Sequence, residues 1–358
     1  MNRKSRDKKN SHLGQLLAPS ILVVRLSSLG DVLLTTPVLR ALRQKWPGAR
    51  ISFLTKEEFA PLLHNNPHLD EVITTSGGGT FEQSRDLVRK LRYRKWDLLV
   101  DLHRSLRSFL FRRLVPAART VVYSKYRLKR TLLIYTRLDL YPASVPLVPE
   151  RYVKPLEPFG VKLDEGPCEL FLDESDREPA LKKISARWPS SPPLLAVAPG
   201  SAWPIKRWPV ESFAESAREL ALRFGFKVIL LGSKKDAEIC ARLAQILGQK
   251  LCLDLAGKLP IRGSAAAVAE ARLLLTNDTG LMHIATAVGT PVVAVFGPTT
   301  RHFGYFPYRA ESRVVETRLY CRPCTHNGRV RCPLGHFRCM KDIKAERVVE
   351  AAVELLNF

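Results

Sequence analysis

An aspartate stands in the turn after the first apolar run of the chain, where a ligand could meet its carboxylate. The stretch "RLSSLGDVLLTTPVLRAL" (25–42) follows Ile21–Val24 and places Asp31 directly after a glycine, at the predicted start of a helix. Turns of this kind usually hold phosphate, because free N–H groups and the helix dipole point at the anion. A carboxylate would repel a phosphate, so Asp31 needs another explanation. N-terminal capping of the helix is the simplest alternative.

A later turn is better suited to an anion. In "LTNDTGLMHIATAVGTPVVAVFGPT" (275–299), an apolar strand is predicted to end at Thr276 and a helix to follow. The first turn of that helix presents the free N–H groups of Thr279, Gly280 and Leu281, and the glycine allows a pyrophosphate to approach closely. Asp278 lies at the rim, where it would accept hydrogen bonds from sugar hydroxyls. Alternatively, Asp278 only caps the helix.

Two further glycine turns follow apolar runs and carry charged residues. In "APGSAWPIKRWP" (198–209), Ser201 belongs to a tight turn, and Lys206 would neutralise charge on a leaving diphosphate. In "LLGSKKDAE" (230–238), Asp236 is placed to bind ribose hydroxyls. Alternatively, Lys206 is a solvated lysine, and Asp236 stabilises the N-terminus of a helix.

Four cysteines near the C-terminus form another cluster of reactive side chains. Cys321, Cys324, Cys332 and Cys339 supply four thiolates within a short segment, enough for a closed tetrahedral zinc site. His326 and His336 are alternative ligands. The predicted zinc is structural and remote from Asp31. Reduced cysteines without a metal are the alternative, because this spacing is not a common zinc-finger pattern.

The elements that must position these residues alternate between short apolar runs and helical patterns. Strands are predicted at 21–26, 50–55, 71–75, 97–102, 119–123, 194–198, 226–231, 250–254, 272–276 and 291–296. Helices are predicted at 31–46, 57–64, 82–95, 104–114, 210–224, 234–247, 264–271 and 279–288. This alternation indicates an α/β fold with two parallel sheets, each covered on both faces. A ligand cleft is expected between the carboxyl ends of the two sheets.

The expected domain boundaries follow from composition. A disordered basic segment (1–19) precedes a first Rossmann-like domain (20–140). A proline-rich linker (141–167) leads to a second Rossmann-like domain (168–340), which includes the Cys-rich insert 321–339. A C-terminal helix (341–358) closes the chain.

The chain is strongly basic, with 57 Lys and Arg against 34 Asp and Glu. This excess favours nucleic acid, an anionic membrane surface or a phosphorylated substrate as the partner. Alternatively, the basic residues form solvated helix faces with no partner. The N-terminus does not resemble a signal peptide, and no apolar run approaches the roughly 18 residues of a transmembrane helix. We therefore expect a cytoplasmic protein that attaches to a membrane only peripherally.

Three motifs together resemble glycosyltransferase family 9, the ADP-heptose:lipopolysaccharide heptosyltransferases. They are "RLSSLGDVLLTTPVLRALR", "PGSAWPIKRWP" and "NDTGLMHIATAVGTPVVAVFGPT", in this order, and the resemblance runs from about residue 20 to the C-terminus. The Cys-rich stretch "CRPCTHNGRVRCPLGHFRCM" (321–340) is similar to one in members that add the second core heptose, with a lengthened first spacer. The resemblance implies a GT-B architecture and an inverting transfer of heptose from ADP-heptose to the inner core of lipopolysaccharide, without a catalytic cofactor.

The resemblance also implies roles for the residues above. Asp31 matches the general base of the acceptor domain, expected to face the donor site across the cleft, and Lys206 matches the lysine at the diphosphate. The implied donor-binding residues are Ser201, Asp236, Asp278, Thr279, Gly280, Leu281 and His283. In an inverting displacement, a carboxylate beside the acceptor removes the hydroxyl proton as the oxygen attacks the anomeric carbon. This role would explain a carboxylate in the first glycine turn.

The basic stretch "DLHRSLRSFLFRR" (101–113) is predicted to serve the acceptor. His103, Arg104 and Arg107 would reach acidic sugars or phosphates of a lipopolysaccharide precursor. Arg112 and Arg113, with 125–130, would hold the enzyme on an anionic inner membrane. Two alternatives remain: a GT-B enzyme that uses another nucleotide sugar, since these motifs do not distinguish the bases, and a basic nucleic-acid-binding protein, although no recognisable nucleic-acid motif is present.

Overall fold

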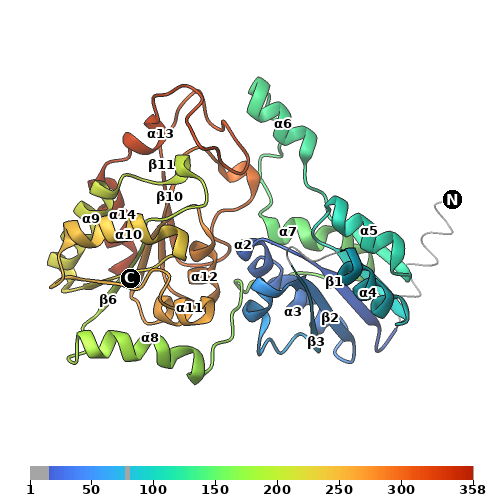
Figure 1. The fold of residues 1–358 in the computed structure, drawn as a ribbon. Helices are drawn as coiled ribbons and strands as arrows, with labels where there is room; N and C mark the ends of the chain where they lie inside the picture. The colour runs from blue at the N-terminus through green and yellow to red at the C-terminus, as the bar shows by residue number, and fades with distance from the viewer. Residues whose placement is uncertain (1–15, 77–80, 358) are drawn as a thin grey trace. The chain divides into compact units, whose positions relative to one another are not determined.

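The chain forms two compact α/β units. The computed structural model describes residues 16–76 and 81–357, except for the side chains of 81–84. Unit 1 contains the described residues up to Lys125 together with Val148–Phe171, and unit 2 contains Tyr126–Leu147 and the described residues from Leu172 onward (Figure 1). Most of the N-terminal segment predicted to be disordered, 1–15 of 1–19, lies outside the described residues.

Unit 1 is a five-stranded parallel sheet in the order β3-β2-β1-β4-β5. Its strands are β1 (Ser20–Val24), β2 (Arg50–Lys56), β3 (Glu71–Thr75), β4 (Trp96–Asp101) and β5 (Ala117–Val122). Its helices are α2 (Leu29–Leu33), α3 (Thr36–Lys45), η1 (Glu57–Leu63), α4 (Phe81–Arg92), α5 (Leu106–Leu114), α7 (Val148–Val153) and η2 (Lys154–Phe159).

Unit 2 is a six-stranded parallel sheet in the order β11-β10-β9-β6-β7-β8. Its strands are β6 (Leu194–Ala198), β7 (Lys227–Leu230), β8 (Cys252–Asp254), β9 (Leu273–Asn277), β10 (Val292–Phe296) and β11 (Ser312–Glu316). Its helices are α6 (Arg127–Thr136), α8 (Glu174–Arg187), η3 (Pro204–Lys206), α9 (Val210–Phe224), η4 (Lys234–Asp236), α10 (Ala237–Leu247), α11 (Ile261–Ala269), α12 (Gly280–Val288), η5 (Arg301–Phe303), α13 (Arg338–Lys341) and α14 (Ala345–Leu356).

Each sheet has a point at which the chain reverses the direction of strand addition. In unit 1, β2 and β3 lie on one side of β1 and β4 and β5 on the other, so the reversal falls between β1 and β4. In unit 2, it falls between β6 and β9. The connections leave in opposite directions there and open a crevice at the carboxyl ends of the strands, which is where open α/β sheets bind ligands. Asp31 follows β1, and Lys206 and Asp278 follow β6 and β9.

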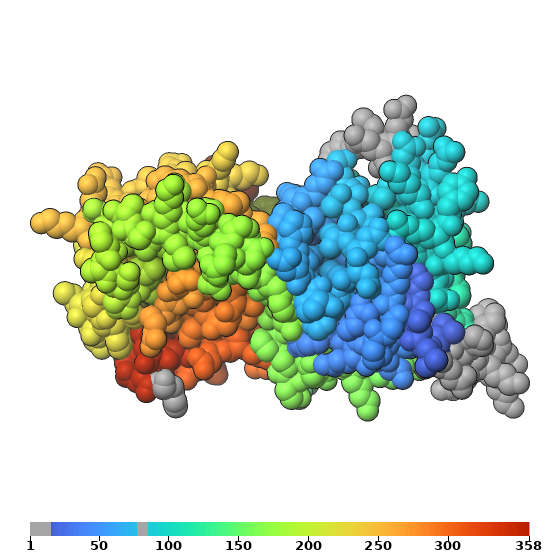
Figure 2. All heavy atoms as spheres, turned by 90° about the horizontal axis from the view of Figure 1, so that it is seen from below, coloured from blue at the N-terminus to red at the C-terminus, as the bar shows by residue number. Residues whose placement is uncertain are grey.

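The strands of unit 2 are buried on both faces, as a parallel sheet requires. Val197, Leu275 and Val295 pack in one core with α9, α10 and α14. The neighbouring residues on these strands, such as Leu274 and Ala294, are equally buried on the opposite face. Helix α8 packs along α11, and Figure 2 shows it in lime green on the surface of unit 2. The predicted α/β fold with two parallel sheets is confirmed.

The predicted elements differ from the structure in a few places. The helix expected at 31–46 is two helices, because α3 begins at Thr36 and carries Pro37 in its first turn, where proline is tolerated. The segment predicted as a linker, 141–167, divides between the units: its first part belongs to unit 2, whereas α7 and η2 bury Tyr152 and Leu156 in unit 1. Helices α6 and α8 and strand β11 were not predicted. No helix among the described residues is long and apolar enough to cross a membrane.

A buried arginine, Arg40, joins α3 to the last segment of unit 1, which follows η2. Arg40 donates from Nε to Asp164 Oδ2 at 2.6 Å and approaches Glu169 Oε1 with Nη1 at 2.7 Å. The hydrogen bond from Arg40 holds the pKa of the Asp164 carboxyl well below its usual range, despite the opposing effect of burial. The segment after η2 is therefore tied to the helix that follows the first glycine turn.

We expect Arg40→Ala to lower the free energy of unfolding by about 2 kcal/mol or more, because it leaves two partly buried carboxylates without their partner. Asp164 has a depressed pKa in the folded protein. The stabilisation by the arginine is therefore fully present above the unfolded pKa of about 4 and is lost progressively as the pH falls below that value toward the folded pKa. Urea unfolding at pH 7 and at about pH 2.5 measures both effects. Arg50→Ala is the matched control, since Arg50 is 67% exposed and lies 3.8 Å from Glu71. An equal loss in the two variants would contradict the assignment.

Candidate active site

The crevice of unit 2 is organised by a buried asparagine at the end of β9. Asn277 accepts a hydrogen bond from the backbone N–H of Trp208 at 3.0 Å and donates from Nδ2 to the carbonyl of Pro199 at 2.8 Å. Both partners belong to the loop that follows β6. One fully buried side chain therefore joins the ends of the two central strands and holds the loop that carries Lys206.

Lys206 and Asp278 form an ion pair in this crevice. Lys206 Nζ lies 2.6 Å from Asp278 Oδ2, and each side chain is only 11% exposed. Thr299 Oγ1 donates to the same oxygen at 2.8 Å. Within the described part of the chain, Asp278 Oδ1 accepts no hydrogen bond. The helix cap is Thr279 and not Asp278, which removes the simplest alternative role of the aspartate.

The turn after Asp278 has the geometry expected of an anion site. Thr279 is extended, with φ −142° and ψ 174°, and α12 begins at Gly280. The first-turn N–H groups of the helix, including those of Gly280 and Leu281, have no partner within the helix itself. His283 is buried in the same helix. The positive end of the helix dipole thus adjoins the Lys206 ammonium.

Asp236 lies against the turn after β6. A Cβ atom on Gly200 would be 2.2 Å from Asp236 Oδ1, so only glycine fits beside this carboxylate. Asp236 Oδ2 accepts hydrogen bonds from the N–H and hydroxyl of Ser233, at 2.9 and 2.7 Å. Ser201 is buried one residue further along the loop. The structure therefore brings Ser201 and Asp236 close to the same turn, while Asp236 also closes the first turn of η4, as the helix-terminal alternative predicted.

The crevice of unit 1 holds Asp31 in an ion pair. Arg25 Nη2 lies 2.6 Å from Asp31 Oδ1, and Ser28 donates to Oδ2 from its backbone N–H at 3.2 Å and its hydroxyl at 2.9 Å. Burial alone would raise the pKa of Asp31, but the charge of Arg25 and the hydrogen bonds from Ser28 outweigh it and hold the pKa below its usual range. Asp31 is at the third position of α2, with Ser28 as the N-cap. The carboxylate is ionised at neutral pH.

The loop after β4 brings a histidine to the same crevice. Asp101, fully buried, accepts hydrogen bonds from the N–H groups of His103 and Arg104 at 2.9 and 2.7 Å and fixes the loop. Burial, with the nearby charges of Arg25 and Lys125, lowers the pKa of His103 to about 4. His103 is therefore neutral at physiological pH, and its Nδ1 has no hydrogen-bond partner among the described residues.

The exposed cations near this loop are arginines. Arg104 and Arg107 are exposed on either side of the N-cap of α5, Ser105. Of the three residues predicted to bind the acceptor, these two carry positive charge at neutral pH, whereas His103 does not.

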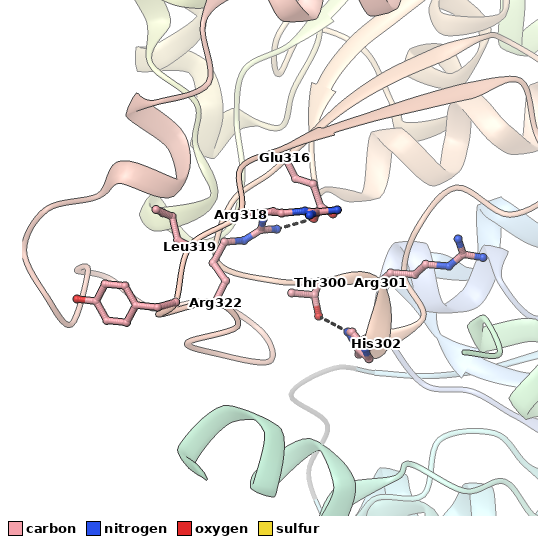
Figure 3. Close-up of a pocket in the computed structure, with 8 residues that line it drawn as sticks. Thr300, Arg301, His302, Glu316, Arg318, Leu319 and Arg322 are labelled. Carbon is pink, nitrogen blue, oxygen red and sulfur yellow. Dashed lines mark hydrogen bonds and ion pairs between the residues drawn. The ribbon is translucent and has the colours of Figure 1, made fainter. Parts of the chain in front are cut away.

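A pocket of about 420 Å³ lies in unit 2 at the carboxyl ends of β10 and β11 (Figure 3). It is lined by Thr300, Arg301, His302, Glu316, Arg318, Leu319, Tyr320 and Arg322. Arg322 lies 2.6 Å from the Glu316 carboxylate, and His302 Nε2 lies 2.9 Å from Asp139 Oδ2. Thr300, which lines the pocket, directly follows Thr299, whose hydroxyl donates to Asp278.

The Cys-rich segment does not have the geometry of a metal centre. All four cysteines are free thiols, and Cys321 Sγ lies 3.8 Å from His336 Nε2. Nowhere in residues 16–76 and 81–357 do three or more His, Cys, Asp or Glu side chains converge as metal ligands would. The predicted structural zinc at Cys321, Cys324, Cys332 and Cys339 is therefore not supported.

Several residues of the two crevices were not predicted as site residues. Arg25 is part of the first motif but was predicted only as part of a strand, and Asn277 only as a possible helix cap. Thr299 and Arg322 carried no signal, because a threonine after a strand and an arginine between two cysteines fit many structural roles. Only Arg25 carried a usable signal in the sequence, because it is a charged residue directly after an all-apolar strand.

The chain is similar to known proteins over nearly its whole length. The model of glycosyltransferase family 9 (heptosyltransferase) matches residues 84–334. Lipopolysaccharide heptosyltransferase 2 of Salmonella typhimurium is 30% identical over 94% of this chain and 98% of its own length. The Escherichia coli protein of the same name is 29% identical, with the same coverage of both chains.

Two solved structures are similar over nearly the whole chain. The glycosyl transferase family 9 protein from Veillonella parvula superposes with a TM-score of 0.80 at 28% identity and covers 95% of this chain and 97% of its own. The E. coli ADP-heptose lipopolysaccharide heptosyltransferase II has a TM-score of 0.73 at 26% identity, with coverage of 94% and 98%.

We expect the imidazole of His103 to show no titration midpoint between pH 5 and 8, because its pKa is lowered to about 4. NMR observation of the ring protons over a pH series measures this value directly. Replacement of Arg25 by Gln removes a positive charge that opposes protonation, so the midpoint should move upward. The neighbouring Asp31 pKa should rise in the same variant. A His103 midpoint near 6.5 in the unaltered protein would refute the burial and charge argument.

Proposed function

Since this chain belongs to glycosyltransferase family 9, the heptosyltransferases, we propose that it transfers heptose from ADP-heptose to the inner core of lipopolysaccharide with inversion at the anomeric carbon. The observation that carries this proposal is the Lys206–Asp278 pair at the N-terminus of α12, in the crevice of unit 2. It combines a positive charge for a diphosphate with a carboxylate oxygen for a sugar. The likeness to lipopolysaccharide heptosyltransferases over nearly the whole chain supports the sugar and the pathway.

Unit 2 is proposed to bind the donor. The diphosphate would lie at the first turn of α12, against Thr279, Gly280 and Leu281, where backbone N–H groups and the helix dipole stabilise negative charge. Asp278 would accept a hydrogen bond from a heptose hydroxyl at Oδ1. Asp236 would contact the ribose beside Gly200. Ser201 and His283 complete the proposed donor-binding residues.

Unit 1 is proposed to supply the general base. The acceptor hydroxyl oxygen forms a bond to the anomeric carbon while the bond from that carbon to the β-phosphate oxygen breaks, and its electron pair leaves with ADP. Asp31, ionised at neutral pH, would take the hydroxyl proton. Lys206 would neutralise charge that develops on the departing diphosphate. We propose that no divalent metal is needed, because the lysine and the helix N-terminus supply that positive charge.

The acceptor is proposed to be held by cations beside the crevice of unit 1. Arg104 and Arg107 are exposed at the start of α5, three and six positions after the end of β4. Phosphates or carboxylates of a lipopolysaccharide precursor would bind these guanidiniums. His103, neutral there, would contribute a hydrogen bond and no charge.

Helix α5 is also proposed to attach the protein to an anionic membrane surface. Leu106, Phe109, Leu110 and Leu114 are all exposed, and their spacing of three or four places them on one face of the helix. Arg107 and Arg113 are exposed on the same helix. The adjacent helix α4 ends in Arg89, Lys90 and Arg92 (Figure 1). An exposed apolar face bordered by basic residues fits the boundary between lipid tails and anionic headgroups.

We expect Asp31→Asn to lower kcat by about 10²–10⁴-fold while ADP-heptose still binds, because loss of a general base slows proton removal without altering the donor site. The assay combines the protein with ADP-heptose and heptose-deficient lipopolysaccharide and follows ADP release and a mass gain of one heptose. Asp86→Asn is the matched control, an exposed carboxylate on α4.

The transfer assay, together with a measurement of DNA binding, separates the alternative functions. Near-normal turnover of Asp31→Asn at saturating substrates would remove the base assignment. Transfer from a UDP- or GDP-sugar in place of ADP-heptose would favour another nucleotide-sugar enzyme. Sequence-independent, salt-sensitive binding to DNA, with no sugar transfer, would favour a nucleic-acid-binding protein.

We expect the double variant Leu106→Glu, Leu110→Glu to lose at least about tenfold in binding to phosphatidylglycerol vesicles, because carboxylates on the apolar face oppose insertion and are repelled by the lipid headgroups. Cosedimentation measures the bound fraction, and phosphatidylcholine vesicles show how much of the binding depends on lipid charge. Leu222→Glu on α9 is the matched control, since Leu222 is 83% exposed in unit 2. Unchanged binding of the double variant would exclude α5 as the contact.

A further inference from the structure

The Cys-rich segment, 321–339, contacts the loop that carries Lys206 and the loop that carries Thr299, whose hydroxyl donates to Asp278. It has no role in the chemistry proposed above, and its side chains do not converge as metal ligands. Its backbone and one of its arginines nevertheless meet the loop after β6, which holds Lys206, and the loop after β10, which contacts Asp278 through Thr299. The segment is therefore placed to determine how these two side chains meet.

The first contact is with the loop that carries Lys206. Gly328 has φ +140°, and a Cβ atom at this position would lie 2.1 Å from Cγ of Trp203, so the backbone there runs directly against the indole. The backbone N–H of Ile205 points to the carbonyl of Arg329, at 3.5 Å. Trp203 and Ile205 are three residues and one residue before Lys206 in the chain. The segment thus covers the loop immediately before the lysine.

The second contact is made by Arg322, between the first two cysteines. Its Nη2 donates to the carbonyl of Thr299 at 2.8 Å and lies 2.6 Å from Glu316 Oε2 (Figure 3). Its Nη1 donates to the carbonyl of Thr317. The next cysteine, Cys324, donates its N–H to the carbonyl of Pro298 at 3.2 Å. The loop after β10 is therefore held from two sides by the start of the Cys-rich segment.

Thr299, the residue held by Arg322, contacts Asp278 directly. Thr299 Oγ1 donates to Asp278 Oδ2 at 2.8 Å, and Lys206 Nζ lies 2.6 Å from the same oxygen. Two donors on one oxygen fix the rotation of the carboxylate, so Oδ1 keeps one direction. Thr299 is buried, and its backbone is anchored by a guanidinium that is itself enclosed. A defined direction of Oδ1 matters if a single sugar hydroxyl is to be recognised.

We propose that Arg322, acting through Thr299, is a positioning residue that sets the orientation of Asp278 toward the sugar of the donor. This proposal rests on the proposed donor site. The Cys-rich segment would then support recognition of the donor sugar by holding the residue that orients Asp278. The expected effect is on the sugar portion of the donor only, because neither Arg322 nor Thr299 touches the turn at which the diphosphate would bind.

The test begins with Thr299→Val, which removes the hydroxyl and keeps the shape of the side chain. We expect kcat/KM for ADP-heptose to fall about 10–100-fold, the range for loss of a hydrogen bond to a charged group, with ADP affinity changed by less than about twofold. Thr299→Ser keeps the hydroxyl and should restore most of the activity. Thr317→Val is the matched control: it makes the same change near Arg322, and its hydroxyl has no hydrogen-bond partner among the described residues.

A double-mutant comparison tests the path from Arg322. Arg322→Lys keeps the charge and loses the planar guanidinium, so it should lower kcat/KM for ADP-heptose and leave ADP binding intact. If Arg322 acts through Thr299, the double variant should be no worse than the more severe single variant. If the losses in kcat/KM of the two single variants multiply in the double variant, Arg322 does not act through Thr299 and the proposal is refuted. Because Thr299→Val is nearly isosteric, it tests the contact to Asp278 even if Arg322→Lys unfolds.

The outcomes separate this proposal from the proposed function. If the unaltered protein transfers heptose and Thr299→Val does so equally well, the positioning role is refuted and the function stands. If Thr299→Val weakens ADP as much as ADP-heptose, the hydroxyl supports the loop in general and the proposal is also refuted. If the unaltered protein shows no transfer from ADP-heptose, the proposed function itself has failed.

Discussion

The reversal of strand order in each sheet is the constraint on which the candidate active site depends. Parallel strands direct all their carboxyl ends to one edge, but only at a reversal do two neighbouring connections diverge and leave a crevice. In unit 1 this point lies between β1 and β4, and in unit 2 between β6 and β9. Asp31, His103, Lys206 and Asp278 follow these four strands. Their positions in the chain are distant, and the topology of each sheet brings them together in pairs.

Each crevice contains a carboxylate paired with a cation, and the two pairs differ in what surrounds them. Asp31 has contacts on both oxygens, from Arg25 and Ser28, which keep it ionised. Asp278 receives Lys206 and Thr299 on a single oxygen. A carboxylate with partners on both oxygens is deprotonated before the reaction, as a general base must be, whereas one with partners on a single oxygen leaves the other oxygen for a ligand. This difference agrees with the separate roles proposed for the two aspartates.

Buried polar side chains at the strand ends hold the loops of both crevices. Asp101 fixes the loop after β4 through backbone N–H groups, and Asn277 joins the loops of β6 and β9. A buried polar group is costly unless its hydrogen bonds are made, so each of these residues restricts the backbone around it to one arrangement. Arg322 does the same for the loop after β10 from outside the sheet. The rigidity of the crevices comes from these few residues.

The sequence alone determined the α/β class, most strands to within two residues, and the turns that carry Asp31, Lys206 and Asp278, because apolar runs and glycine turns are local patterns. It did not determine strand order, and so could not show which turns meet. Helix α8 and strand β11 were missed because their patterns are weak, and α7 and η2 because proline-rich segments resemble linkers. The low pKa of His103 and the contact of Thr299 with Asp278 depend on charges and donors distant in the chain. The cysteine spacing suggested zinc, but ligand geometry is set by how a loop folds, and among the described residues the tertiary structure forms no group of three or more ligands that could hold a metal.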